Sequence, residues 1–158
     1  RGAGSAAMTG LAFEDLEVGR DYPLGSYAVT REEIIAFATD FDPQPFHLDE
    51  AAAADSMFGG LAASGWHTAA MAMRLMYDGV IAGSTAAGGL GVDRLDWRRP
   101  VRPGATLIGR LRVVDKRLSQ SRPGFGIVRA EVVVENGAGE TVLTMVAPAL
   151  FGLREAGA

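Results

Sequence analysis

The residues best suited to chemistry lie in the stretch FDPQPFHLDE, residues 41–50. This stretch places Asp42 five positions before His47, one of two histidines in the chain, with two prolines between them. A carboxylate can orient a water or an imidazole, and a histidine takes up or releases a proton near neutral pH. The pair therefore predicts a proton-transfer site. The alternative is a structural one, in which Asp42 bonds to its own backbone in a stiff turn and His47 is a buried, hydrogen-bonded histidine.

A second element of a possible site is the sequence SGWHT, residues 64–68. Ser64 is a plausible cap for a helix that begins at Gly65. Amides in the first turn of a helix lack intrahelical acceptors, and the helix dipole favours negative charge there. The Gly65 amide could thus stabilise an enolate or thioester oxygen as charge develops on it, as in an oxyanion hole. The alternative is that Ser64 is only a cap and Gly65 only allows close packing.

Other polar residues are weaker candidates for a functional site. We expect His67 to be structural, since buried histidines usually serve only to satisfy hydrogen bonds. A metal site built from His47, His67, Asp42 and Asp49 matches no recognised ligand spacing, so we expect no metal.

Two basic clusters stand at predicted strand ends, where they either meet the phosphates of a long ligand or are simply solvated. These clusters are Arg98, Arg99 and Arg102, and Lys116, Arg117 and Arg122.

The elements that must position the site can be read from capping and turn residues. Thr30 and Glu33 have the spacing of a capping box and predict a helix over 31–41, preceded by a strand within 20–30. Pro43 ends this helix at Asp42, and Pro45 should keep the following chain extended. The longest predicted helix, about 64–82, is apolar almost all round and should be enclosed.

Alternating apolar segments separated by turn sequences follow this helix and predict four antiparallel strands. They lie within 88–101, 105–118, 124–136 and 140–153. A long helix covered by one curved antiparallel sheet is an α+β hot-dog arrangement. We expect a single domain over residues 8–158, with residues 1–7 a remnant of cloning before Met8.

Composition excludes several functions. The chain has 158 residues, no cysteine and a net charge of −4, so thiol chemistry is impossible and neither nucleic acid nor an anionic membrane is an expected partner. The longest apolar run is interrupted by His67, Arg74 and Asp78. Its uninterrupted apolar stretches are therefore too short to span a membrane. We expect a cytoplasmic protein.

The region from Phe37 to Met76 resembles the MaoC-like dehydratase family, which includes (R)-specific enoyl-CoA hydratases. The most specific parts are a D-x-x-P-x-H segment that here runs from Asp42 to His47, the Leu48-Asp49 that follows, the Phe58-Gly59-Gly60 turn and the glycine that opens the central helix. The similarity covers nearly the whole chain and implies a hot-dog fold.

The resemblance also implies an activity. Asp42 and His47 would hold a water that adds across the double bond of a 2-enoyl thioester, and the Gly65 amide would bind the thioester carbonyl. Ser64 stands where many relatives carry histidine. The implied substrate is an acyl-CoA, with no further cofactor, and the implied assembly is a homodimer or a higher homo-oligomer. Side chains that would shape the acyl pocket are Phe46, Met57, Trp66, Met73 and Trp97.

Two other functions remain open. A hot-dog thioesterase would direct water at the thioester carbonyl and commonly has a carboxylate on the central helix, where this chain offers only Asp78 near the far end. A non-catalytic module that binds acyl thioesters would keep the fold without needing Asp42 and His47.

Overall fold

The computed structural model describes residues 10–154, and within them a curved antiparallel sheet packs against a long helix. The segment 1–7, predicted as a remnant of cloning, lies outside the described residues. The strands are β1 (Asp21–Ala28), β2 (Ala86–Gly89), β3 (Arg94–Trp97), β4 (Thr106–Leu118), β5 (Phe125–Glu135) and β6 (Thr141–Gly152). The α-helices are α1 (Arg31–Phe41), α2 (Glu50–Ala54) and α3 (Gly65–Met76), and short 3-10 turns occupy η1 (Phe13–Asp15) and η2 (Pro45–His47).

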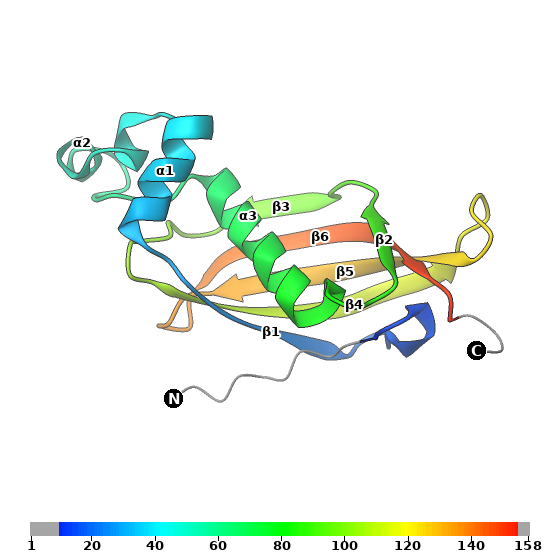
Figure 1. Cartoon of the computed structure of the whole chain (residues 1–158). Helices are drawn as coiled ribbons and strands as arrows, with labels where there is room; N and C mark the ends of the chain where they lie inside the picture. Colours follow the sequence, from blue (N-terminus) through cyan, green and yellow to red (C-terminus); the bar gives the residue numbers. More distant parts are fainter. Residues whose placement is uncertain (1–9, 155–158) are drawn as a thin grey trace.

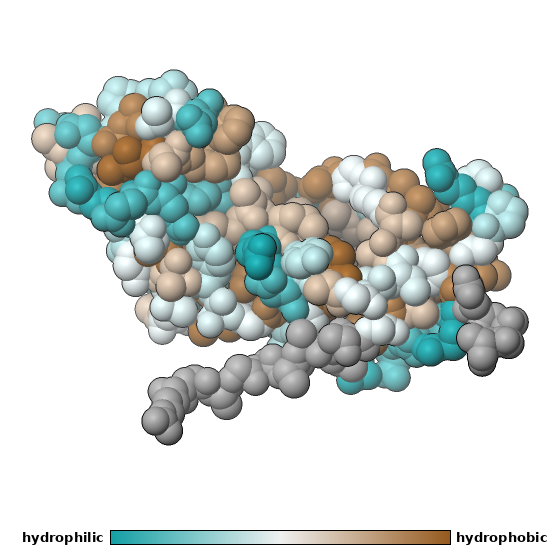
Figure 2. All heavy atoms as spheres, in the orientation of Figure 1, coloured by the Kyte–Doolittle hydropathy of each residue, from teal (hydrophilic) through white to brown (hydrophobic). Residues whose placement is uncertain are grey.

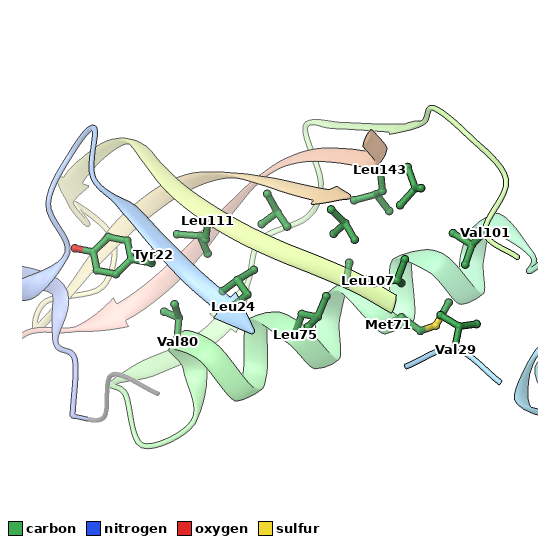
Figure 3. Packing of buried hydrophobic residues seen from close by; sticks show 14 of the residues in the cluster. Tyr22, Leu24, Val29, Met71, Leu75, Val80, Val101, Leu107, Leu111 and Leu143 are labelled. Carbon is green, nitrogen blue, oxygen red and sulfur yellow. The ribbon is translucent and has the colours of Figure 1, made fainter. Parts of the chain in front are cut away.

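The sheet follows the order β1-β4-β5-β6, and both β2 and β3 pair with the far side of β6. Helix α3 lies across one face of this sheet, while α1 and α2 gather at one end of the molecule (Figure 1). Met71 and Leu75 of α3 are buried in one cluster with Leu107 and Leu111 of β4 (Figure 3). This arrangement confirms the predicted hot-dog fold.

Helix α1 begins and ends as the sequence predicts. The Thr30 hydroxyl accepts from the Glu33 amide at 3.2 Å, and the Glu33 carboxylate accepts from the Thr30 amide at 3.3 Å. The helix ends at Phe41 with Asp42 as its C-cap, because the residue before a proline is pushed out of the helical region. The first catalytic candidate is therefore fixed at a helix end.

The single strand predicted for residues 88–101 is wrong, because this segment is divided between β2 and β3. β2 pairs with Ala149–Phe151 and β3 with Leu143–Val146, so Ala147 and Pro148 interrupt the ladder. Pro148 accepts a bond from the Leu90 amide at 3.0 Å but has no N–H to donate in return. Gly91 takes a φ of +126°, which lets the chain turn out of the strand there.

The prediction that the central helix is enclosed on every side is also wrong for the single chain. Met71, Ala72 and Leu75 face the sheet and are buried. On the opposite side Trp66 is 62% exposed and Tyr77 is 49% exposed. In the space-filling view, hydrophilic, intermediate and apolar residues are mixed along this helix, and a brown, apolar patch lies at the end of the molecule where α1 and α2 gather (Figure 2).

The helical segment continues past α3 in a π-helical turn, η3 (Tyr77–Ile81), so its predicted length is confirmed while its last turn is wider than an α-helix. In the described part of the chain, no helix combines the length and the apolar character that crossing a membrane requires.

Candidate active site

A cleft of about 610 Å³ opens at the N-terminal end of α3. It brings together eight of the nine residues predicted for catalysis or for the substrate pocket, which are Asp42, Phe46, His47, Met57, Ser64, Gly65, Trp66 and Trp97. Gln44, Phe58, Ala63, Thr68, Arg98, Arg99, Pro100 and Val101 complete its lining. Their individual roles stay predictions, but the structure places them around one space.

The short turn η2 carries His47 back toward Asp42. The prediction that the chain stays extended through the second proline is wrong, because Pro45 begins a 3-10 turn in which the Leu48 amide donates to the Pro45 carbonyl at 3.1 Å. Proline suits this first position, where its missing N–H leaves no donor unpaired. The turn sets Nε2 of His47 3.3 Å from Oδ2 of Asp42.

The other nitrogen of the His47 ring is held by the backbone. Nδ1 lies 2.6 Å from the carbonyl oxygen of Ala62, and the ring is buried. A carbonyl only accepts hydrogen bonds, so Nδ1 must carry the proton in this contact. In the neutral ring, Nε2 is then unprotonated and faces Asp42 with its lone pair free to accept a proton.

The Asp42 carboxylate is held on its other oxygen. The Gln44 side-chain amide donates to Oδ1 at 2.7 Å, and the other carboxylate oxygen, Oδ2, is the one that faces His47. Burial raises the pKa of Asp42, but the Ser64 hydroxyl, the Gln44 amide and the charge of His47 together outweigh it, so the pKa lies below its usual value. Asp42 is therefore ionised at neutral pH.

Ser64 is the N-cap residue of α3, as predicted, but its side chain makes no capping hydrogen bond. Its hydroxyl oxygen is buried and has no partner within ordinary hydrogen-bond geometry among the residues that the structure describes. It is near enough to Asp42 to lower the pKa of that carboxyl, although the contact falls short of a fully formed hydrogen bond. The hydroxyl thus belongs to the cleft, where a ligand or a water would complete its bonding.

The amide of Gly65 opens α3 and precedes the helical ladder, which begins where the Thr68 amide donates to the Ser64 carbonyl at 3.0 Å. A side chain at Gly65 would lie 2.6 Å from the ring of Trp97. The structure therefore supplies a packing reason for this glycine beside the predicted role of its amide. Trp97 in turn meets Trp66 edge to face, with 5.2 Å between ring centroids, and the two indoles form one wall of the cleft.

The remaining predicted pocket residues lie in different positions relative to the cleft. Phe46 packs edge-on against the His47 ring with 4.6 Å between centroids. Met57 is 93% exposed and lies at the rim. Met73 does not line this cleft but a second, apolar cavity of about 380 Å³ farther along α3, which also includes Met76 and Val80.

His67 points away from the cleft. Its ring stacks on Phe37 with 4.7 Å between centroids, and its buried Nδ1 has no partner among residues 10–154. Burial lowers the pKa of His67 against a smaller opposing effect of Glu33. Asp49 is engaged elsewhere, since its carboxylate caps α2 at the Ala52 amide, 2.9 Å away. Nothing in the described segment groups three or more acidic or histidine side chains as metal ligands.

The first basic cluster divides between two positions. Arg98 and Arg99 line the cleft, where Arg99 pairs with Glu140 at 3.0 Å and Arg98 lies 3.8 Å from Asp96. Arg102 turns toward the backbone of residues 58–61. In the second cluster, the Lys116 ammonium donates to the Phe13 carbonyl at 3.0 Å, and none of its three residues lines the cleft.

Sequence reasoning missed two partners of the proton-transfer pair. Gln44 stands between the two prolines, and its position two residues after an aspartate was the available signal. The Ala62 carbonyl is a backbone group, and no side chain at that position could have indicated its contact with His47.

Comparisons with known proteins agree with one another. The sequence profile described as "MaoC like domain" matches residues 15–136. The solved structure of the MaoC-like dehydratase from Rhodospirillum rubrum is 43% identical, with a TM-score of 0.86, covering 92% of this chain and 99% of that one. R-hydratase PhaJ1 from Pseudomonas aeruginosa is 26% identical, with a TM-score of 0.71, covering 92% and 88%. The uncharacterized protein YdeM from Bacillus subtilis (strain 168) is 28% identical over 115 residues, which are 73% of this chain and 82% of YdeM.

Proposed function

The chain belongs to the MaoC-like domain family, and on that premise we propose that it is a hydratase that adds water reversibly across the double bond of a trans-2-enoyl thioester. The observation that carries this proposal is the pair of proton acceptors on one side of the cleft, with 3.3 Å between Nε2 of His47 and Oδ2 of Asp42. The reverse reaction dehydrates a 3-hydroxyacyl thioester.

The two acceptors suit a water that donates one hydrogen bond to each of them. As the water oxygen bonds to C3, one of its protons passes to the Asp42 and His47 pair. The electron pair of the double bond moves toward the thioester carbonyl, and the proton then passes from the pair to C2 of the substrate. Water and proton thus both come from the face of the substrate that Asp42 and His47 occupy. This chemistry needs no metal or redox cofactor.

The negative charge that develops on the thioester oxygen needs a donor. In the proposed mechanism this is the Gly65 amide, which stands ahead of the α3 hydrogen-bond ladder at the positive end of the helix dipole. A donor fixed in the backbone needs no rearrangement as the charge forms, so it stabilises the transition state more than the substrate.

The test is the loss of absorbance of the conjugated thioester when crotonyl-CoA is added to the wild-type chain, to Asp42→Asn and to His47→Gln. We expect wild type to hydrate the substrate and each variant to lose about 10²–10⁴-fold in rate, which is the usual contribution of general acid–base catalysis. Both variants should stay folded by circular dichroism. Unchanged rates in the folded variants would contradict the proposed roles.

The position of Asp78 weighs against a thioesterase. Its carboxylate is half exposed at the far end of the helical segment, pairs with Arg74 at 3.0 Å and does not line the cleft. Release of free thiol from crotonyl-CoA would reveal this activity. Binding of crotonyl-CoA with neither hydration nor release of free thiol would instead indicate a non-catalytic module.

In our proposal, the acyl chain of the substrate and its carrier contact different parts of the molecule. Arg98 and Arg99 line the cleft and offer cations to the phosphates of a CoA or of a carrier-bound phosphopantetheine. Trp66 lines the cleft and Met73, seven residues or about 10 Å farther along the helix, lines the apolar cavity. In our proposal the acyl chain runs along α3 in this direction.

We also propose that the chain forms a homodimer. Strands β2 and β3 pair only with β6 among the described strands, so their other edge is open. Exposed apolar side chains lie on these strands and between them, including Leu90, Val92 and Trp97. A second copy would cover both the open edge and these side chains.

A further inference from the structure

We propose that Arg102 is a positioning residue for His47, acting through the carbonyl group of Ala62. This inference rests on the proposed function, in which Nε2 of His47 accepts a proton from water. Arg102 does not line the cleft and does not touch His47. Its effect would pass through the loop that carries the Ala62 carbonyl.

That loop needs an external support. Between Ala54, the last residue of α2, and Gly65, the first of α3, the backbone forms neither helix nor strand. Its carbonyl groups are therefore not fixed by a regular ladder of hydrogen bonds. The Ala62 carbonyl nevertheless has to hold a definite position, because it accepts the 2.6 Å hydrogen bond from Nδ1 of His47.

Arg102 supplies three of the hydrogen bonds that hold this loop. Its Nη1 donates to the carbonyl of Gly60 at 2.8 Å and to that of Leu61 at 3.4 Å, and its Nη2 donates to the carbonyl of Phe58. The neighbouring Val101 carbonyl accepts from the Ala63 amide at 2.9 Å. The bonds from residues 101 and 102 thus enclose Ala62 on both sides along the chain.

The geometry depends on a guanidinium group. A planar fork with several donors can hold three carbonyl groups at once, whereas an ammonium group is a compact charge on a flexible stem. Arg102 forms no ion pair with a residue in the range 10–154, and the hydrogen bonds described for its side chain all go to this loop. Gly60 fits the same contact, since a side chain there would lie 3.3 Å from Nη1 of Arg102.

The consequence for His47 concerns its tautomer. While the Ala62 carbonyl is in place, the ring proton stays on Nδ1 and Nε2 is free to act as a base. If the loop shifts, that preference is lost, and a fraction of the neutral rings will carry the proton on Nε2. Those rings cannot accept a proton from the water.

A direct test reads the tautomer without any substrate. Nitrogen-15 chemical shifts of the two histidines, measured where both rings are neutral, distinguish a protonated Nδ1 from a protonated Nε2. His47→Gln assigns the signals. We expect the Nδ1–H form of His47 in wild type, a mixture of tautomers in Arg102→Met and unchanged signals from His67, which lies outside the cleft. Unchanged His47 signals in a folded Arg102→Met chain would overturn the proposal.

A kinetic test uses the hydration of crotonyl-CoA. Arg102→Met should lower kcat by about 10–100-fold, the scale of a small misplacement of a catalytic group, with KM changed by less than about 3-fold. Arg102→Lys should fall between Arg102→Met and wild type, and Gly60→Ala should lower kcat less than Arg102→Met does.

The matched control is Arg110→Met, which also removes an exposed arginine and one side-chain contact, the 2.9 Å pair with Glu135, and should leave both constants unchanged. A rise in KM at constant kcat would overturn the proposal, because it would make Arg102 a substrate-binding residue. If wild type itself fails to hydrate crotonyl-CoA, the proposed function fails, while the nitrogen-15 measurement still decides whether Arg102 controls the His47 ring.

Discussion

Asp42 owes its ionised state to neighbours that counteract its burial. The Gln44 amide is the closest of these donors, 2.7 Å from Oδ1, and it belongs to the same loop. Because a carboxyl with a lowered pKa stabilises the folded chain above its unfolded pKa, this contribution is lost only as the pH falls through the lowered value. For Asp42 that loss occurs below its ordinary pKa of 3.8.

Gln44→Ala should raise the pKa of Asp42 relative to wild type. The substitution removes one of the donors that lower this pKa, and it leaves the burial that raises it. The carbon-13 shift of the Asp42 carboxyl, followed against pH, measures the change without relying on activity. The stability contribution of Asp42 should accordingly be lost at a higher pH. Gln120→Ala, which changes an exposed glutamine far along the chain, is the control, and equal Asp42 titrations in the two variants would count against this account.

The spacing of the sequence was sufficient to bring the site residues together, for a local reason. Asp42 and His47 are separated by one short turn, so their proximity depends on few intervening dihedral angles. The partner of Nδ1 could not be read in the same way. The Ala62 carbonyl is placed by tertiary contacts with Phe46, Val101 and Arg102, and nothing about an alanine indicates that its backbone will bind a histidine.

The helical segment that carries the site is anchored at its other end by a close contact with β1. Gly79, in the π-helical turn η3, lies so near to this strand that a side chain there would be 2.6 Å from the Cα of Leu24. A backbone atom cannot move aside as the end of a flexible side chain can. The absence of a side chain at Gly79 thus lets the end of the helical segment lie directly against β1.

Gly79→Ala should therefore destabilise the chain by about 1–3 kcal/mol, the usual effect of overfilling a packed interior. For a chain of this size, each kcal/mol corresponds to a fall in Tm of about 2–4 °C. Thermal unfolding followed by circular dichroism measures it. Gly137→Ala is the matched control, because a side chain there meets nothing within 4 Å and the expected change is within about 0.5 kcal/mol. Equal melting temperatures for the two variants would refute the packing argument.

Element boundaries were predictable where a local signal exists. The capping box at Thr30 and the proline after Asp42 define both ends of α1. The division between β2 and β3 was not predicted, because it depends on Pro148 in the partner strand β6 as well as on Gly91 within the segment. The pairing of β1 with β4 joins strands that are far apart in the sequence, so neither strand alone indicates it.

At the scale of the molecule, the exposed apolar side chains predict how copies associate. Leu90→Glu places a charge between β2 and β3 at the open edge of the sheet and should convert the proposed dimer to a monomer, because an unpaired charge is unfavourable in a buried interface. Sedimentation velocity measures the change. Ile108→Glu introduces the same charge at an equally exposed apolar residue, 51% in both cases, on β4 and away from this edge. It should leave the dimer intact, and a monomeric wild type would refute the prediction.

The pairing of β1 with β4 has a consequence for the order in which the chain folds during synthesis. Asp21 of β1 and Arg112 of β4 form a salt bridge across 91 positions, and β4 is the only named strand that pairs with β1 in the described part of the chain. The growing chain must therefore release β1, all three α-helices, β2 and β3 before the first strand finds its partner. Folds that depend on such distant pairings gain their stability late and fold in milliseconds to seconds. Until Arg102 and β4 have left the ribosome, Asp42 and His47 can be joined by the short turn η2. The loop that carries the Ala62 carbonyl is not yet held by Arg102, and the sheet is not yet formed.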